Sequence, residues 1–120
     1  MNSKELEGCL KSLAYKIVDL CEALPHKKVS RVIEDQLVRS AFSAAANYRA
    51  ACKAISRKSF VSELSIAFEE ADESLFWLEG INELKLLPVE KLSGSIKEAS
   101  ELASILAASR KTLQQQTKSK

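Results

Sequence analysis

The stretch from Ser40 to Phe60 reads SAFSAAANYRAACKAISRKSF and combines many alanines with several cations. Alanine is the best helix former, and its small side chain allows two helices to approach closely. Arginine and lysine are the side chains that contact phosphate groups. The stretch therefore predicts a helix, and it raises the question of whether that helix forms part of a core or binds a ligand.

Apolar residues recur every three or four positions along nearly the whole chain, which is the spacing of an amphipathic helix. The pattern breaks around Pro25 and again between Pro88 and Gly94, and a third break is expected where Ser56 or Ser59 could cap a helix. Four amphipathic helices with short links predict an all-α, antiparallel up-down-up-down four-helix bundle. The predicted helices span residues 3–24, 30–55, 56–86 and 89–115.

Each predicted helix has one apolar stripe that would face the core of the bundle. The expected core residues are Leu6, Leu10, Leu13, Ile17, Leu20 and Leu24 in the first helix; Ile33, Leu37, Ala41, Ala44, Tyr48, Ala51 and Ile55 in the second; Phe60, Leu64, Ala67, Phe68, Ala71, Leu75 and Leu78 in the third; and Leu92, Ile96, Ala99, Ala103, Leu106 and Leu113 in the fourth. We expect a single domain over residues 1–116, followed by a polar tail at residues 117–120.

The composition argues against several classes of protein. The three cysteines have no C-x-x-C spacing, and no signal peptide or long apolar run opens the chain, so we expect a reduced, soluble, cytoplasmic protein. His26 is the only histidine, which leaves too few ligands for a zinc site and no base for a serine or cysteine nucleophile. No glycine-rich phosphate loop occurs. We therefore predict a protein that is not an enzyme and that has no metal or cofactor.

Charge is distributed unevenly along the chain. Residues 26–58 contain eight Lys or Arg against two Asp or Glu, whereas residues 59–83 contain seven acids and no cation. At 100° per residue, the cations of the second helix fall opposite its buried stripe, where they form either an ordinary solvated face or an anion-binding one. Together with the lysines at the helix ends, the candidate nucleic-acid-binding residues are Lys27, Lys28, Arg31, Arg39, Arg49, Lys53, Arg57 and Lys58.

A second apolar set lies outside the predicted core. Phe42 shares the basic face of the second helix and could stack on a base or contact another subunit. Trp77 could pack against its own chain, but a helix with two apolar faces is hard to bury in a monomer, which favours a subunit interface. The predicted interface residues are Phe42, Ile66, Trp77, Ile81 and Leu84.

The acidic residues of the third helix lie between its two apolar stripes. No Glu-x-x-His pair is present, and the carboxylates spread around the helix instead of converging. They predict a solvated face, or a surface complementary to the basic helix of another subunit.

Three short motifs between residues 36 and 84 carry a family resemblance. They are SAAANYRAA at residues 43–51, SRKSF at residues 56–60 and SIAFEEADESLFWLE at residues 65–79. In these motifs the chain resembles the bacterial four-helix-bundle proteins named after the intervening sequences of 23S rRNA genes. The matching residues are Ser43, Ala46, Asn47, Tyr48, Arg49, Ala51, Ser56, Phe60, Leu64, Ser65, Ile66, Ala67, Glu70, Ala71, Asp72, Glu73, Ser74, Trp77, Leu78 and Glu79.

The resemblance implies a left-handed bundle that assembles into a ring-like homopentamer. It also implies relatives that serve as accessory proteins of diversity-generating retroelements, in which a basic pentamer binds RNA and the reverse transcriptase. The chain departs from the family pattern at Ala50, where glutamate is usual, and at Ala45, where glycine is common. A contact network that depends on that glutamate is therefore not carried over to this chain.

Two functions fit these observations. The first is a non-catalytic oligomeric accessory protein that binds RNA or DNA through the basic face of the second helix. The alternative is a protein-interaction scaffold whose basic and acidic faces dock subunits or a partner protein.

Overall fold

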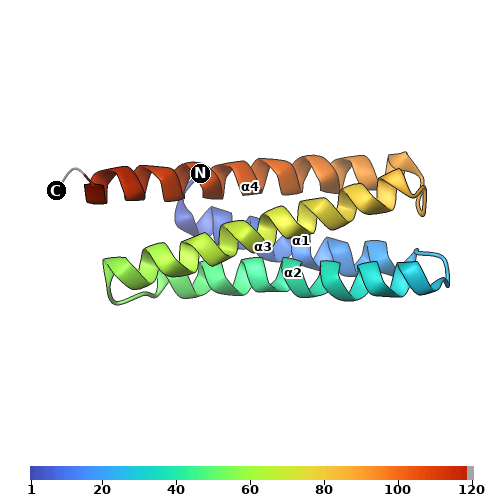
Figure 1. The fold of residues 1–120 in the computed structure, drawn as a ribbon, viewed down its shortest axis with the longest axis horizontal. Helices are drawn as coiled ribbons and strands as arrows, with labels where there is room; N and C mark the ends of the chain where they lie inside the picture. The colour runs from blue at the N-terminus through green and yellow to red at the C-terminus, as the bar shows by residue number, and fades with distance from the viewer. Residues whose placement is uncertain (119–120) are drawn as a thin grey trace.

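A computed structural model describes residues 1–118 of the chain, which form four α-helices with no strand among them (Figure 1). The helices are α1 (Ser3–Glu22), α2 (Lys28–Cys52), α3 (Arg57–Glu83) and α4 (Val89–Lys118). Successive helices run in opposite directions and form an elongated bundle of 52 × 23 × 20 Å (Figure 1). The predicted all-α, up-down-up-down four-helix bundle is thereby confirmed. Among residues 1–118, none of the helices has the long apolar stretch that a membrane span requires.

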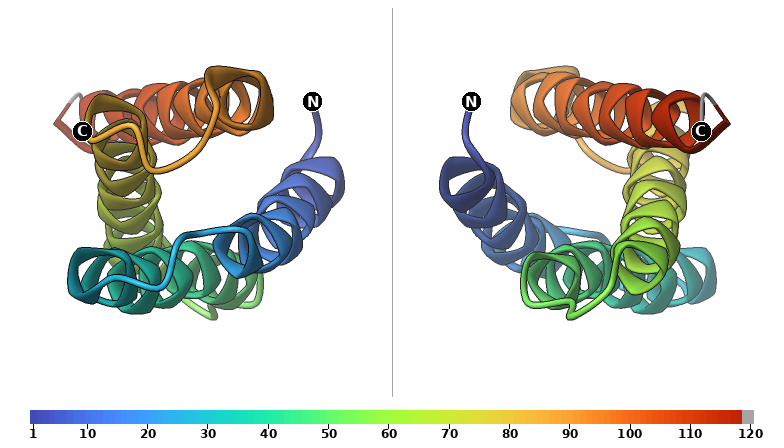
Figure 2. Two further views of the ribbon diagram at one scale, coloured as in Figure 1. Left: turned by 90° about the vertical axis from the view of Figure 1, so that its right-hand side faces the viewer. Right: turned by 90° about the vertical axis from the view of Figure 1, so that its left-hand side faces the viewer.

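The helices follow one another around the long axis in the order of the sequence (Figure 2). Each helix packs against two neighbours, and the contact between α2 and α3 is the most extensive, whereas that between α1 and α4 is the least. The acidic helix α3 and the helix that carries the predicted basic face, α2, are therefore neighbours within one chain.

Buried positions repeat every seven residues in this bundle. A repeat of seven residues keeps the buried seam facing the core only when the helices wind around one another with a left-handed twist, as in coiled coils. This repeat is consistent with the predicted left-handed bundle. The buried positions at this spacing are Leu10, Ile17 and Leu24; Ser30, Leu37, Ala44 and Ala51; Leu64, Ala71 and Leu78; and Leu92, Ala99 and Leu106.

A pair of buried serine hydroxyls joins α2 to α3. The Oγ atoms of Ser40 and Ser74 lie 2.9 Å apart, and both side chains are almost completely buried. The Ser40 hydroxyl also lies 3.1 Å from the carbonyl oxygen of Leu37, and the Ser74 hydroxyl donates to the carbonyl of Glu70 at 2.9 Å. Both polar groups are therefore satisfied in the core, as most buried hydroxyls are.

The connection between α2 and α3 starts earlier than predicted. The α2 helix ends at Cys52, and Ile55 lies in the turn with its side chain fully exposed, so its predicted place in the core was wrong. The predicted cap at Ser56 is confirmed, because its side chain accepts a hydrogen bond from the Ser59 backbone N–H at 3.0 Å. Arg57 is consequently the first residue of α3 and not part of α2.

The end of α3 is a Schellman turn, a C-terminal cap in which one residue adopts a left-handed conformation. That residue is Lys85, with φ of 55°. The backbone N–H of Leu86 bonds to the carbonyl of Ile81 at 3.0 Å, and that of Lys85 bonds to Asn82 at 3.1 Å. The turn ends α3 at Glu83, three residues before the predicted boundary.

The last helix continues further than predicted. It reaches Lys118, so residues 117 and 118 of the predicted polar tail are helical, and residues 119 and 120 lie outside the described residues.

Most of the predicted core is buried, with two kinds of exception. Six residues that we expected to be buried are only partly so: Leu20, Phe60, Phe68, Leu75, Ile96 and Leu113. Conversely, the core contains residues that the pattern did not predict: Ala14, Cys21, Ser30, Ser40, Ser74, Ile81, Leu87 and Leu102.

Ile81 is the most informative of these differences. It is completely buried in the core of its own chain, so its predicted place in a subunit interface was wrong. A stripe that repeats every seven residues shifts by about 20° per repeat relative to a helix of 100° per residue. Measured from Phe60, the buried stripe has shifted by about 60° at Ile81. The shift moves Ile81 into the core and leaves Phe60 at its edge.

Candidate nucleic-acid interface

The predicted basic residues do not form one continuous stripe. Lys27, Lys28 and Arg31 lie at the start of α2, whereas Arg49 and Lys53 lie at its end. At 1.5 Å per residue, Arg31 and Arg49 are about 27 Å apart along the helix. The start of α3 adds Arg57 and Lys58 to the cations at the second end. The structure thus divides the predicted set into two clusters at opposite ends of the bundle.

Arg39, midway between these clusters, interacts with α3 of its own chain. Its Nη1 atom lies 2.9 Å from Glu70 Oε2, its Nη2 atom contacts Glu73 Oε2, and its Nε atom donates to Gln36 Oε1 at 3.2 Å. The hydrogen bonds from Glu73 and Glu70 raise the pKa of Arg39. The Trp77 indole donates to Glu73 Oε2 at 3.0 Å, and this bond, followed by those from Arg39, lowers the pKa of Glu73. We therefore leave Arg39 out of the candidate interface.

A groove between α1 and α2 combines cations with exposed aromatic rings. Its cavity volume is about 440 Å³. The rings of Tyr15 and Phe42 face each other across it, with centroids 5.9 Å apart and planes tilted by 55°. Tyr15 is 52% exposed and Phe42 is 40% exposed. The groove is lined by Glu7, Lys11, Ala14, Tyr15, Phe42, Ala45, Ala46, Arg49 and Lys53.

Helical spacing positions the cations of this groove around its rings. Lys11 lies one turn before Tyr15 on α1, and its Nζ atom is 6.0 Å from the centre of the tyrosine ring. Phe42 and Arg49 are seven residues apart and so lie on one line along α2, with Lys53 one turn further. Three cations and two rings therefore border one groove.

A buried tyrosine lies close to this groove. Burial raises the pKa of Tyr48 to about 12, with further contributions from Cys52 and from the carboxylate of Glu7. The Tyr48 phenol therefore remains neutral at physiological pH and adds no negative charge. Glu7 is the one acidic side chain among the residues that line the groove.

Lys11 and Tyr15 were missed by the sequence analysis. Their spacing of four residues on the outer face of the first helix was visible in the sequence. The role of these two residues in a groove could not be predicted, because the first 25 residues are slightly acidic overall and because α2 forms the other wall of the groove.

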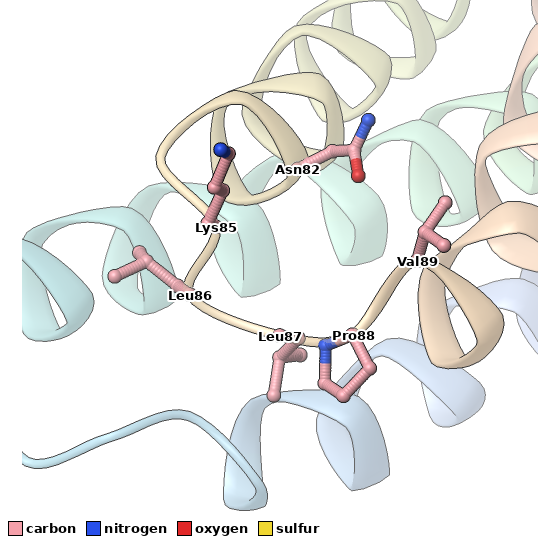
Figure 3. A pocket seen from close by; sticks show the side chains of 6 residues that line it. All are labelled: Asn82, Lys85, Leu86, Leu87, Pro88 and Val89. Carbon is pink, nitrogen blue, oxygen red and sulfur yellow. The ribbon is translucent and has the colours of Figure 1, made fainter.

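A larger hollow, of about 620 Å³, lies at the connection between α3 and α4 (Figure 3). Its side chains point in different directions and do not converge on a common point (Figure 3). The residues lining it are Asn82, Lys85, Leu86, Leu87, Pro88 and Val89. Lys85 is the one charged residue among them, so this hollow offers fewer charged side chains to a ligand than the groove between α1 and α2.

The remaining predicted interface residues differ in accessibility. Ile66 is 39% exposed and Leu84 is 56% exposed, whereas Trp77 is half-buried against the core. Phe76, which the sequence analysis did not single out, is 62% exposed. Within residues 1–118, no group of three or more His, Cys, Asp or Glu side chains is placed to hold a metal ion.

Comparison with known proteins gives a family match over most of the chain. Residues 9–108 match the family described as 23S rRNA-intervening sequence protein. A comparison with curated proteins found no match. The fold is similar to the crystal structure of a protein with unknown function from the S23 ribosomal protein family of Bacteroides thetaiotaomicron VPI-5482. The two chains are 29% identical with a TM-score of 0.82, and the similarity covers 92% of this chain and 99% of that one. The chain therefore belongs to the 23S rRNA-intervening sequence protein family.

Proposed function

We propose that this protein is a non-catalytic, cytoplasmic oligomer that binds RNA or DNA through the groove between α1 and α2. The observation that carries the proposal is the meeting of Lys11, Arg49 and Lys53 with the exposed rings of Tyr15 and Phe42. Cations neutralise the phosphates of a nucleic acid, and exposed aromatic rings stack on unpaired bases.

Other cations extend this surface beyond the groove. Arg57 and Lys58 begin α3 next to the turn that follows Lys53, and Arg57 donates to Gln116 of α4 at 3.0 Å. In this proposal, the cluster of Lys27, Lys28 and Arg31 at the far end of α2 is a second phosphate contact on a longer strand. Assembly into a homopentamer, as the resemblance implies, would repeat the groove five times. A reverse transcriptase, or another protein partner, would then be recruited to the bound RNA.

A titration of fluorescently labelled single-stranded RNA tests the proposal. Anisotropy should show binding at about 50 mM salt that weakens as salt rises, with a slope of about −0.7 in log K against log salt for each neutralised phosphate. Reversal of the three groove cations, as Lys11→Glu, Arg49→Glu and Lys53→Glu, should abolish the binding. Reversal of three exposed lysines of α4, Lys91, Lys97 and Lys111, is the matched control and should weaken it far less.

The contribution of the aromatic rings to binding can be measured separately from that of the cations. Replacing Tyr15 and Phe42 by alanine should weaken binding by roughly tenfold without changing the salt slope, because stacking on one base contributes about 1–3 kcal/mol and releases no counterion. No binding at low salt, or equal losses in the groove and control variants, would refute the nucleic-acid proposal.

A protein-interaction scaffold is the second candidate function, favoured by two exposed apolar residues, Ile66 of α3 and Leu84 directly after it. In a scaffold, these side chains would contact another subunit or protein, and any binding of nucleic acid would be incidental. The ion pairs of Arg39 with Glu70 and Glu73 use part of the complementary charge within one chain, which weakens docking of the basic helix on the acidic helix of another subunit.

A further inference from the structure

The outer face of α3 presents an aromatic ring that its own chain does not cover. Phe76 is 62% exposed, more than any other aromatic side chain among the described residues. In the seven-residue repeat that buries Ala71 and Leu78, Phe76 occupies the position that points most directly away from the core. Exposure of a large ring at this position offers apolar surface to a partner.

Contacts with neighbouring side chains of α3 fix the orientation of this ring. Phe76 packs edge to face against Trp77, with centroids 5.0 Å apart and planes at 76°. Trp77 is in turn fixed by its hydrogen bond to Glu73, which is paired with Arg39. One turn after Phe76 stands Gly80, where an added Cβ atom would meet nothing within 4 Å. The aromatic pair is therefore ordered before binding, and open space lies next to it.

Carboxylates surround the ring. Residues 59–83 contain seven acids and no lysine or arginine, and Arg39 compensates only Glu70 and Glu73. Asp72 and Glu79 lie one turn before and one turn after Phe76 on the exposed side of α3. An exposed ring between two free carboxylates suits a guanidinium group, which stacks on the ring and pairs with the acids.

The same chemistry occurs within the chain. The guanidinium carbon of Arg110 on α4 lies 4.3 Å from the centre of the Phe68 ring on α3. Phe76 offers an equivalent ring on the outer side of the helix, without an arginine of its own chain.

We propose that the Phe76–Trp77 surface of α3 docks an arginine-bearing segment of a partner protein, with one guanidinium stacked on Phe76 between Asp72 and Glu79. Glu69 and Glu83, two turns away on either side, extend the acidic surface over about 21 Å. An extended segment of about six residues spans that distance. A nucleic acid is repelled by this face, so the site is distinct from the groove between α1 and α2 and does not depend on the function proposed for it.

Trp77 provides the signal for a direct test, because it is the only tryptophan in the chain. A short peptide in which arginine alternates with alanine should shift the Trp77 fluorescence at low salt, whereas the same peptide with glutamine in place of arginine should not. Phe76→Ala should weaken the binding by about fivefold, and the double variant D72N/E79Q by about tenfold.

Two exposed residues elsewhere serve as controls. Phe42→Ala removes a ring from α2, and Glu101→Gln removes a carboxylate from α4, and each should change the affinity for the peptide less than twofold. Binding of the arginine peptide by RNA-free protein, lost in the α3 variants and kept in the controls, supports the docking site. RNA binding should be unchanged in Phe76→Ala, which separates the two proposals.

Three results would overturn the docking site. The first is no binding of the arginine peptide at a peptide concentration of about 1 mM. The second is equal binding by the wild type and Phe76→Ala, or of the arginine and glutamine peptides. The third is a loss of mass in Phe76→Ala by light scattering, which would show that a second copy of this chain covers the face.

Discussion

The Ser40–Ser74 hydrogen bond allows the contact between α2 and α3 to be tested quantitatively. Both hydroxyls are buried, so losing their mutual bond should cost about 1 kcal/mol. Alanine favours a helix over serine by about 0.5 kcal/mol, which offsets half of that cost. Each single variant, Ser40→Ala or Ser74→Ala, should therefore be about 0.5 kcal/mol less stable than the wild type.

The double variant should behave differently from the sum of the two. It loses the same hydrogen bond only once but gains the helix preference of alanine twice, so its stability should equal that of the wild type. The expected coupling energy is about 1 kcal/mol.

The wild type, the two single variants and the double variant form a double-mutant cycle. Urea unfolding followed by circular dichroism, at one protein concentration for all variants, measures their free energies of unfolding. A parallel cycle that pairs Ser40→Ala with Ser104→Ala, an exposed serine of α4, should show no coupling. If the Ser40–Ser74 cycle were additive, so that the double variant lost about 1 kcal/mol, the hydrogen bond would not contribute as the geometry indicates.

Two further predictions concern pH. Burial, with a smaller contribution from Glu34, raises the pKa of the Cys21 thiol from 9.0 to about 12. The protonated thiol is therefore favoured in the folded protein, and its contribution to the free energy of unfolding is complete below pH 9 and is lost as pH rises toward 12. Cys21→Ala should therefore lose less stability than the wild type between about pH 8 and pH 11, measured by urea unfolding, and identical profiles would contradict this. The pKa of Glu73 is lowered by Trp77 and Arg39, so its stabilisation is present above the pKa of an unfolded carboxyl and is lost as pH falls through the folded value. Thermal unfolding from about pH 6 to pH 3 should show a smaller decrease for Glu73→Gln than for the wild type, and an equal decrease would count against these hydrogen bonds.

The four-helix fold could be predicted from the sequence because apolar spacing and helix-breaking residues are local signals. The cap at Ser56 was likewise predictable, because a serine cap acts on the backbone N–H three residues later. The error at Ile81 has a different cause. A wheel of 100° per residue describes a straight helix, whereas the buried stripe of α3 follows a repeat of seven residues and shifts along the helix.

The end of α2 was less predictable because several short stretches of chain could each have formed the turn. Extending the helix to Ile55 placed that side chain in the core and Arg57 on the basic face, and both assignments changed when the turn began after Cys52. The sequence contained no proline or glycine at this turn that would have fixed its start.

The candidate site depended on tertiary neighbours that no single helix reveals. The pairing of Arg39 with Glu70 and Glu73 follows from the packing of α3 beside α2, although Arg39 lies more than 30 positions before both acids in the sequence. The groove requires Tyr15 of α1 to face Phe42 of α2. Charge counts along the sequence showed where cations are abundant, but the packing of the helices determines which of them pair with acids of the same chain.

The unequal lengths of the helices have a consequence for how the bundle opens. The ion pair between Lys16 and Glu98 aligns α1 with α4, and from that point α4 extends about 30 Å toward its end whereas α1 extends only about 20 Å toward its start. The last turns of α4 therefore pass beyond α1, and Leu113 there is only partly covered. This end of the molecule should fluctuate open without global unfolding. Since Lys53 and Arg57 lie at the same end, a nucleic-acid strand bound there would restrict that motion.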